Sequence, residues 1–411
     1  MLFKNATLCD YQGIKEGDLR TENGIITAIG SLTPLPNEEI FDVGGKLLFP
    51  AMIDLNVAPK SLSLSVKNLL TLSEKALKGG VGSILLYPYT NPTCSENGSI
   101  ELIKSLNAQS PIHLLPAINP LNAEGKLSDI STLHNSGGWA IFARSDTNAH
   151  TLMRIAQYAQ MLEIPLICLC QDTSLSDGVM NEGLLSASLG LPAIPSYSQT
   201  KEVAKIAEML CSLPIKVIFD TLVYPRSFEI LRIFKEHLSP IKASFFTQTS
   251  IHHLILDESL CENYNTAAKI NPPLVDKHSQ EQLLNLVQKS KVDLLTSLQC
   301  ADFKSKKDQV FELASFGIDE LENYFSLLYT FLHKQYQIPL PLISRLTSYT
   351  PAQILNLNKG ALQEGKIAEI CIADTQTQYI RNDTFSPYHQ HHLYGRIEAF
   401  LSNEILYTPH Q

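Results

Sequence analysis

The chain has 411 residues, of which 44% are hydrophobic and 18% charged, and a net charge of −9. This composition argues against disorder, and the length favours one large domain with a smaller one. The acidic residues are scattered along the chain, and the sequence lacks the clustered basic face that nucleic-acid binding requires. No apolar run reaches the ~20 residues that are needed to span a membrane. Because the start at Met1 also lacks a signal-peptide pattern, we expect a cytoplasmic protein.

Strand patterns fill the first 48 residues and return near the end of the chain. They cover Leu2–Cys9, Gly24–Ile29, Gly44–Leu48, Ile367–Ala373, Arg396–Leu401 and Glu404–Tyr407. Turn signals separate them at Asp10–Gly13, at Glu22–Gly24 and at Ser402-Asn403. We therefore expect a small β-sandwich domain built from both termini, residues 1–48 and 361–411.

Strand and helix patterns alternate through the middle of the chain, residues 49–360. The strand-like runs are Leu47–Leu55, Ser83–Pro88, Ile112–Ile118, Trp139–Arg144, Leu166–Gln171, Lys216–Asp220, Ile241–Phe246 and Val292–Thr296. Helical patterns between them include Ala149–Leu162, Lys201–Cys211, Ser227–His237 and Glu281–Lys289. Eight such units predict an α/β fold of the TIM-type (β/α)8 barrel kind. A doubly wound open sheet is the alternative, but no glycine-rich phosphate loop follows the first strand.

Barrel enzymes carry their chemistry at the C-terminal ends of the strands. The residues predicted there are Asn56, Ala58, Lys60, Tyr87, Tyr89, Arg144, Ser145, Asp146, Leu169, Cys170, Gln171, Asp220, Thr221, Ser297, Gln299 and Cys300. No histidine is among them, whereas a hydrolytic zinc site needs about three imidazole or carboxylate ligands on one cation. Two other patterns are weak. Cys168-Leu169-Cys170 lacks a second cysteine pair and favours a structural role, and a solvated loop explains His389, His391 and His392 better than a metal site does.

Several segments are similar to dihydroorotase, and together they cover nearly the whole chain. Pro50-Ala51-Met52-Ile53-Asp54 resembles the start of the Pro-Gly-x-Ile-Asp-x-His-x-His-x-Arg segment of the cyclic amidohydrolases. Further similar segments, in the family's order, are Tyr87–Pro92, Gly178–Gly183, His252–Leu254, Lys269–Leu274, Phe311–Gly317, Tyr349–Ala352 and Gly365–Ile370. The resemblance implies a metal-hydrolase barrel with a composite β domain.

The positions that carry chemistry in the family hold other residues in this chain. The resemblance places the metal ligands and the catalytic aspartate at Asn56, Ala58, Arg144, Leu169, Thr221 and Ser297. Ser145 is the neighbouring alternative to Arg144, and Asp220 is the neighbouring alternative to Thr221. We therefore expect no metal, the family zinc included, and no other cofactor. Arg144 could fill the vacated position with a fixed positive charge, or it could pair with Asp146 or reach solvent.

The substrate pocket of the family is partly retained. Its arginine falls at Lys60, which cannot form the bidentate carboxylate fork, whereas Asn271, Phe316 and Gly317 match the family. These three can be retained as turn residues without any ligand, and we favour that structural role.

Three functions remain in view. The favoured one is a catalytically inactive dihydroorotase-like protein of pyrimidine biosynthesis. Inactive homologues of this kind associate with aspartate carbamoyltransferase, so the resemblance implies that partner and an assembly role; homodimerisation stays open. The second is an active amidohydrolase or dihydroorotase with an atypical site that uses Cys168, Cys170, Asp220 or the serines. The third is a small-molecule sensor that retains a pocket without the metal.

Overall fold

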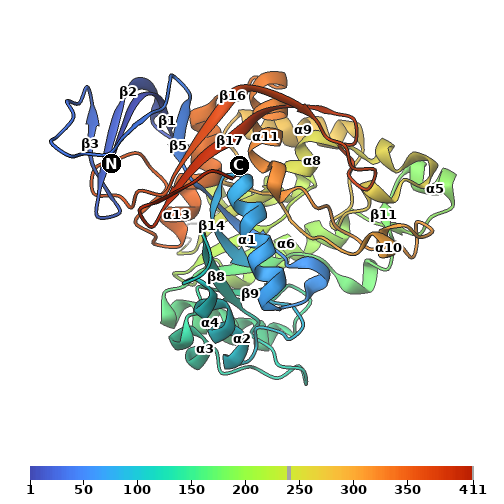
Figure 1. Cartoon of the computed structure of the whole chain (residues 1–411). Coiled ribbons are helices and arrows are strands. Elements are labelled where there is room, and N and C mark those ends of the chain that lie inside the picture. Colours follow the sequence, from blue (N-terminus) through green and yellow to red (C-terminus); the bar gives the residue numbers. More distant parts are fainter. Residues whose placement is uncertain (238–241, 410–411) are drawn as a thin grey trace.

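The computed structural model describes residues 1–237 and 242–409, and its largest part is a nearly closed parallel barrel (Figure 1). Eight strands follow one another around it in chain order. They are β6 (Met52–Val57), β7 (Val81–Leu86), β8 (His113–Ile118), β9 (Ala140–Arg144), β10 (Leu166–Leu169), β13 (Lys216–Asp220), β14 (Ser244–Ser250) and β15 (Leu294–Thr296). Just beyond β6, the N–H of Ala58 donates to the carbonyl of Gln299 at 2.8 Å and so joins the last strand to the first. The predicted TIM-type barrel is confirmed.

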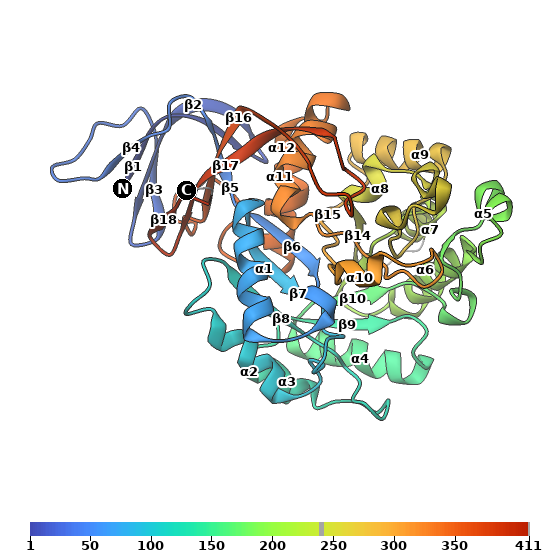
Figure 2. The same ribbon diagram turned by 45° about the vertical axis from the view of Figure 1, so that its right-hand side comes forward.

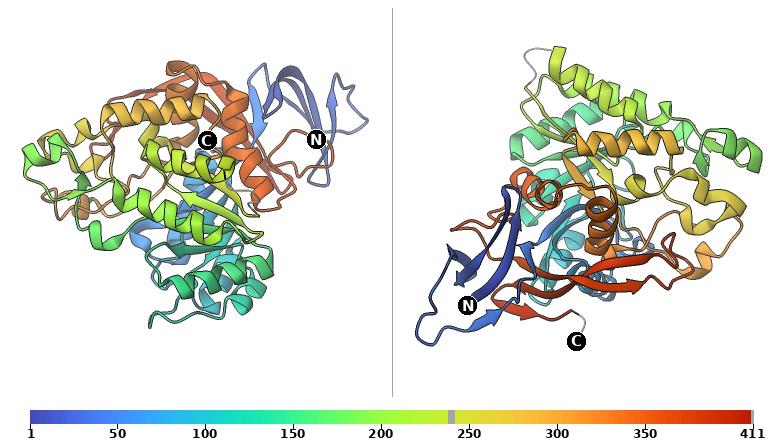
Figure 3. Two further views of the ribbon diagram at one scale, coloured as in Figure 1. Left: turned by 180° about the vertical axis from the view of Figure 1, so that it is seen from behind. Right: turned by 90° about the horizontal axis from the view of Figure 1, so that it is seen from above.

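Helices alternate with these strands and cover the outside of the barrel (Figure 3). They are α1 (Val66–Lys78), α2 (Asn97–Leu106), α3 (Ile130–Ser136), α4 (Ala149–Leu162), α5 (Leu184–Leu189), α6 (Tyr197–Leu210), α7 (Pro225–His237), α8 (Ile251–Ile255), α9 (Lys277–Gln288), α10 (Lys304–Lys307), α11 (Tyr324–Leu327), α12 (Leu340–Ser344) and α13 (Thr350–Ile354). In α4 the buried residues Leu152, Ile155, Ala156 and Ala159 follow the three-and-four spacing of one helix face. This spacing is why α4 lies within the predicted bounds.

Short segments complete the barrel part. They are the paired strands β11 (Met180–Asn181) and β12 (Ala193–Ile194), the 3-10 turns η1 (Lys60–Leu62), η2 (Thr173–Leu175), η3 (Glu258–Tyr264), η4 (Thr266–Ala268) and η5 (Leu321–Asn323), and the π-helical segments η6 (Leu328–Gln335) and η7 (Arg345–Tyr349). None of the helices in the described part of the chain is both long and apolar enough to span a membrane.

The remaining strands come from the two ends of the chain and form one sheet beside the barrel (Figure 2). They are β1 (Leu2–Asp10), β2 (Gly13–Glu22), β3 (Ile25–Gly30), β4 (Ile40–Asp42), β5 (Leu47–Pro50), β16 (Ile370–Ile380), β17 (His392–Ser402) and β18 (Ile405–Tyr407). Their order is β18-β17-β16-β5-β1-β2-β3, with β4 also paired to β1. Phe3, Leu48, Ile372 and Leu401 belong to a separate hydrophobic core on this sheet. The additional β part drawn from both ends is thus confirmed, while the residue boundaries of the two domains stay a prediction.

The first barrel strand differs from its prediction. We expected one strand over 47–55, but β5 pairs with β1 and β16 in the terminal sheet, and only β6 belongs to the barrel. Both pieces are buried along their whole length, so the sequence shows one mainly apolar run in which only Asp54 is charged. Two further strands differ from their predictions because their sequences are polar and lack the apolar pattern of a buried strand. The charged strand β2 was not predicted, and β14 extends to Ser250 rather than ending at Phe246. The predicted start of that strand, at residue 241, lies outside the described residues.

Candidate functional site at the barrel mouth

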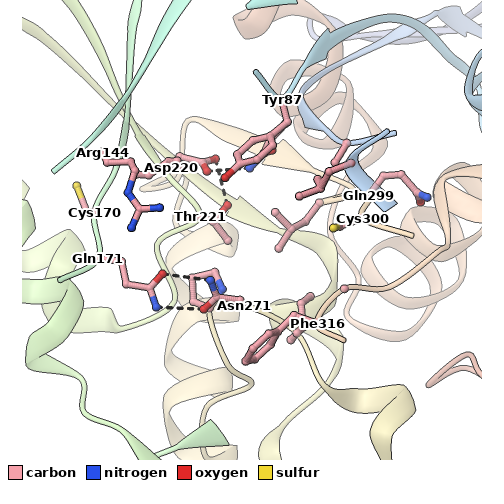
Figure 4. Close-up of a pocket in the computed structure, with 18 of the residues that line it drawn as sticks. Tyr87, Arg144, Cys170, Gln171, Asp220, Thr221, Asn271, Gln299, Cys300 and Phe316 are labelled. Atoms are coloured by element: carbon pink, nitrogen blue, oxygen red, sulfur yellow. Dashed lines mark hydrogen bonds between the residues drawn. The ribbon is translucent and has the colours of Figure 1, made fainter. Parts of the chain in front are cut away.

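A cavity of about 250 Å³ opens at the C-terminal ends of the barrel strands (Figure 4). Most of the residues predicted to form the site line it, namely Asn56, Ala58, Tyr87, Arg144, Leu169, Cys170, Gln171, Asp220, Thr221, Asn271, Gln299, Cys300, Phe316 and Gly317. The predicted residues that are not among the lining residues are Lys60, Tyr89, Ser145, Asp146 and Ser297. Lys60 is exposed, and its ammonium lies 4.7 Å from the centre of the Phe303 ring, whereas Ser297 is buried. The eight-stranded ring therefore brings together residues as far apart in sequence as Asn56 and Gly317, as the barrel topology requires.

The polar centre of the cavity is the carboxylate of Asp220. It accepts hydrogen bonds from Asn56 Nδ2 at 2.8 Å, Gln248 Nε2 at 2.5 Å and Thr221 Oγ1 at 3.1 Å. Of the two strand-six alternatives, Asp220 is thus the one that contacts the Asn56 side chain. Burial raises the pKa of Asp220 to about 7, and the nearby carboxyl of Asp54 adds to the rise while the hydrogen bonds oppose it.

A second buried carboxylate, Asp54, lies on the same strand as Asn56. It accepts hydrogen bonds from Thr296 Oγ1 at 2.5 Å and from the backbone N–H groups of Ser297 at 2.8 Å and Asn56 at 3.2 Å. Burial also raises the pKa of Asp54 above its usual value. These bonds tie β6 to β15 directly below the cavity. Through these hydrogen bonds, Asp54 fixes the register between the first and the last barrel strand.

Arg144 stands at the rim of the cavity. Its Nε and Nη2 atoms lie 3.3 Å from the two carboxylate oxygens of Asp146, and 44% of its side chain is exposed. Asp146 also accepts a hydrogen bond from Thr173 Oγ1 at 2.5 Å. Figure 4 shows the guanidinium on the side of the cavity where Cys170 and Gln171 lie, and no dashed line joins it to Asp220. Arg144 therefore pairs with Asp146 and contacts solvent, and it does not fill the centre of the mouth.

Two amide side chains close one side of the opening. Gln171 Nε2 donates to Asn271 Oδ1 at 3.1 Å and Asn271 Nδ2 donates to Gln171 Oε1 at 3.1 Å, as Figure 4 shows. Beside them, Gly317 has φ +112°, and an added Cβ would overlap the carbonyl oxygen of Cys300. Gly317 is thus required by the backbone at this point, which supports the structural role expected for it.

The donor atoms at the mouth do not fit the zinc ion of the hydrolytic family. Asp220 is the one acid among the described lining residues, and three side chains already donate to it. Burial raises the pKa of Cys300 to about 11 and that of Cys170 well above its usual value, so neither is a ready thiolate ligand. Within residues 1–237 and 242–409, no three His, Cys, Asp or Glu side chains are grouped so as to hold a metal ion.

Two histidines lie closer to the strand ends than the sequence indicated. Because β14 extends to Ser250, His252 and His253 follow it immediately, and both are fully buried. His253 contacts Ser250 Oγ at 2.7 Å and the carbonyl of Pro272 at 2.9 Å, and His252 Nδ1 lies 2.8 Å from Tyr388 Oη. Burial lowers the pKa of both rings. Neither ring lines the cavity, so both are neutral groups of the core behind it.

Sequence reasoning missed the lining residue Gln199. It also missed Gln248, which donates to the carboxylate of Asp220. Gln248 lies on β14, in a stretch predicted to come after the strand, and its amide is buried against Asp220. The signal was the pair of β-branched residues Thr247 and Thr249, a residue type that is enriched in strands and that continues the strand with polar side chains. A polar residue inside a barrel strand needs a buried partner, and the carboxylate supplies it.

Comparison with known proteins agrees with this architecture. A family model described as dihydro-orotase-like matches residues 45–212. Two probable dihydroorotase-like proteins from strains of Helicobacter pylori are 29% and 30% identical to this chain over 402 residues, covering 98% of this chain and 96% of each protein. A dihydroorotase from Acetivibrio thermocellus is 27% identical over 421 residues, 98% of this chain and 97% of that protein.

The fold is also similar to solved structures. An L-hydantoinase (dihydropyrimidinase) from Arthrobacter aurescens superposes with a TM-score of 0.87 at 16% identity, covering 98% of this chain and 95% of that one. At this identity the likeness concerns the fold alone. The relative at 30% identity extends along nearly the whole chain, and the matched segment includes the first barrel strands. This chain therefore belongs to the dihydroorotase-like family of the amidohydrolase superfamily.

Proposed function

We propose that this protein is a non-catalytic member of its family and acts as a structural partner in the assembly of aspartate carbamoyltransferase. One observation carries the first half of the proposal. The Asn56 side chain, where the resemblance implies a metal-binding histidine, instead donates a hydrogen bond to Asp220. The Asp220 carboxylate thus already has side-chain donors, and a metal would have to displace those bonds.

Catalysis by the protein's own side chains is also poorly supported. Hydrolysis of a cyclic amide needs an activated nucleophile and a group that exchanges protons with the substrate. The hydroxyl of Ser297 is buried outside the cavity, and the thiols of Cys170 and Cys300 have raised pKa values. Asp220 has a pKa suited to proton exchange, and the hydroxyl of Thr221 donates to it, but the amides of Asn56 and Gln248 donate to the same carboxylate and occupy its oxygens. These features favour the non-catalytic proposal over an amidohydrolase with an atypical site.

Measurements of bound metal and of dihydroorotate turnover together test the proposal that the protein is non-catalytic. Protein purified without added metal should contain well under one equivalent of zinc by elemental analysis, and it should not hydrolyse dihydroorotate. Asn56→His should not restore activity, because a single imidazole beside one carboxylate leaves the ligand set incomplete. An active dihydroorotase purified in parallel is the control. About one equivalent of bound zinc with turnover that a chelator abolishes would refute the proposal.

The partner is proposed from the resemblance described above. The barrel offers a rigid surface for it, since a standard interface takes about 800 Å² from each partner, about one twentieth of the 16629 Å² surface described here. Co-expression with the aspartate carbamoyltransferase of the same organism, followed by size-exclusion chromatography, tests the proposal. The two chains should elute together, and the transferase should assemble less well alone. A transferase that assembles fully without this chain and does not bind it at micromolar concentrations would refute the partnership.

A ligand-sensing role is the second candidate, and the open cavity favours it. Arg144 at its rim and the Gln171–Asn271 pair could orient a small carboxylate without any chemistry. Dihydroorotate is the probe, and its effect on the melting temperature is the measurement. A saturable rise that Arg144→Gln abolishes would favour sensing, whereas no rise up to millimolar concentrations would remove this candidate.

A further inference from the structure

A second cavity, of about 280 Å³, lies away from the barrel mouth and shares no lining residue with it. It is enclosed by the C-terminal end of α1, by the segment from η5 to α11, and by β16 and β17 of the terminal sheet. Figures 1 and 2 show α1 lying beside these two long strands. The cavity therefore stands at the junction between the barrel and the terminal sheet.

Three cationic side chains, Lys78, Arg381 and Arg396, face this cavity. Arg381 is neutralised: its Nε lies 2.9 Å from Glu320 Oε1, and its Nη atoms lie 3.5 Å from carboxylate oxygens of Glu322 and Asp383. Lys78 and Arg396 differ from it, since neither has a carboxylate within 4.0 Å among the described residues. Glu322 also lines the cavity, but its carboxylate lies against Arg381, so Lys78 and Arg396 are the two lining cations without an ion-pair partner among the described residues.

Arg396 is held in place by other means. Its guanidinium carbon lies 4.8 Å from the centre of the Tyr379 ring, so one face of the group is covered. The Tyr379 hydroxyl is fixed by hydrogen bonds to Asn323 Oδ1 at 2.8 Å and Ser326 Oγ at 2.9 Å. The neighbouring Gly395 has φ +82°, and Ser326 Oγ donates to its carbonyl at 2.6 Å. A stacked guanidinium on a fixed backbone keeps its N–H edge oriented for a ligand at a low entropic cost.

We propose that this cavity binds a small phosphate-bearing molecule, with Lys78 and Arg396 as its two charged contacts. A phosphate monoester carries close to two negative charges at neutral pH, which the two unpaired cations match. The edge of a guanidinium fits two phosphate oxygens, and an ammonium adds a compact charge beside it. The volume lies just below the range of drug-sized ligand sites, so it suits a molecule of sugar-phosphate size. Binding there would join α1 of the barrel to β17 of the terminal sheet.

Isothermal titration of the full-length protein with pyrophosphate and with inorganic phosphate tests the proposal, at constant ionic strength because exposed charges are screened by salt. We expect saturable binding that Arg396→Gln and Lys78→Gln each weaken about tenfold, the typical effect of removing a charged hydrogen-bond partner. Lys67→Gln is the matched control: it removes the same charge from an exposed position at the other end of α1 and should change affinity less than twofold.

Two features keep this test decisive. Lys78→Gln changes a partly exposed helix residue and should leave the fold intact. Arg396→Gln removes the guanidinium that stacks on Tyr379. Circular dichroism checks that both variants are folded. Citrate is the third probe, and it should bind more weakly than pyrophosphate. Absence of saturable phosphate or pyrophosphate binding, equal binding by the wild type and both variants, or a preference for citrate would each overturn the proposal.

Discussion

The buried carboxylate of Asp220 should make the stability of this protein fall as the pH rises. Its pKa of about 7 in the folded protein lies about three pH units above the usual value of 3.8. Between these two values the folded state holds a proton that the unfolded chain has lost, so the free energy of unfolding falls by about 1.4 kcal/mol per pH unit. The stability is fully retained below about pH 4. Above pH 7 the loss levels off at about 4 kcal/mol.

Asp220→Asn should remove this pH dependence and little else. The new amide keeps the shape of the carboxyl group and still accepts from Asn56. Gln248 can adapt by rotating its amide, because its Oε1 atom is buried without a hydrogen-bond partner and can accept from the new N–H. Relative to wild type, the variant should therefore gain about 2.5 kcal/mol of stability between pH 5 and pH 8.

Urea unfolding followed by circular dichroism at pH 5, 6, 7 and 8 measures this difference. Asp308→Asn is the control, since it makes the same chemical change at an exposed position and should follow the wild type at every pH. Comparing variant with wild type cancels the titration of all other groups that the two share. If the two proteins lose stability in parallel from pH 5 to pH 8, the buried carboxylate does not titrate in this range and the reasoning fails.

Three further substitutions test other parts of the structure. Lys359→Met should lower the free energy of unfolding by about 3–5 kcal/mol, because the buried carboxylate of Glu369, 2.8 Å from the ammonium in the wild type, loses this partner. Adding Glu369→Gln to the same chain should recover most of this loss in urea unfolding. If the double variant is as unstable as Lys359→Met alone, the pairing is contradicted. Gly317→Ala should destabilise by about 2–4 kcal/mol through its positive φ and its overlap with a carbonyl oxygen, whereas Gly98→Ala, which points into open space on a helix, should be neutral or stabilising. Asn56→Asp places a second acid beside the buried carboxylate of strand six and should lower the melting temperature more at pH 8 than at pH 5; an equal drop would argue against their repulsion.

The fold could be predicted well because its signals are local. The apolar spacing of α4 and the uninterrupted apolar runs of the parallel strands reflect burial that each segment shows by itself. The division of 47–55 into β5 and β6 could not be seen in this way. Both halves are buried, and the first half is assigned to another sheet by its pairing with β1 and with β16, the latter more than 300 residues away. Apolar periodicity reports that a strand is buried, but not which neighbours bury it.

The candidate site was predictable in position but not in its interactions. Strand ends identified Asn56, Asp220 and Arg144 as neighbours of one opening, because the barrel topology fixes that edge. The hydrogen bond from Asn56 to Asp220 depends on the relative rotation of two side chains from strands one and six, and the part played by Gln248 depended on where β14 ends. Sequence spacing does not show either contact, since both are set by the three-dimensional register of the barrel; Thr247 and Thr249 indicate only that the strand continues.

The position of β5 between β1 and β16 also has a consequence for synthesis on the ribosome. Leu48 on β5 pairs with Ile372 on β16, which is translated roughly 320 residues later. At ~5–20 residues per second, this edge of β5 therefore lacks its partner strand for about 15–60 s during synthesis. During that interval an apolar strand edge is exposed to other nascent chains, which is a hazard for mispairing. Completion of the terminal sheet thus has to wait until β16 and β17 have been translated, and the β16–β17 hairpin is the last segment needed to cover that edge. Chains released early, before this hairpin, should be captured by chaperones or aggregate, even though their barrel strands are all present.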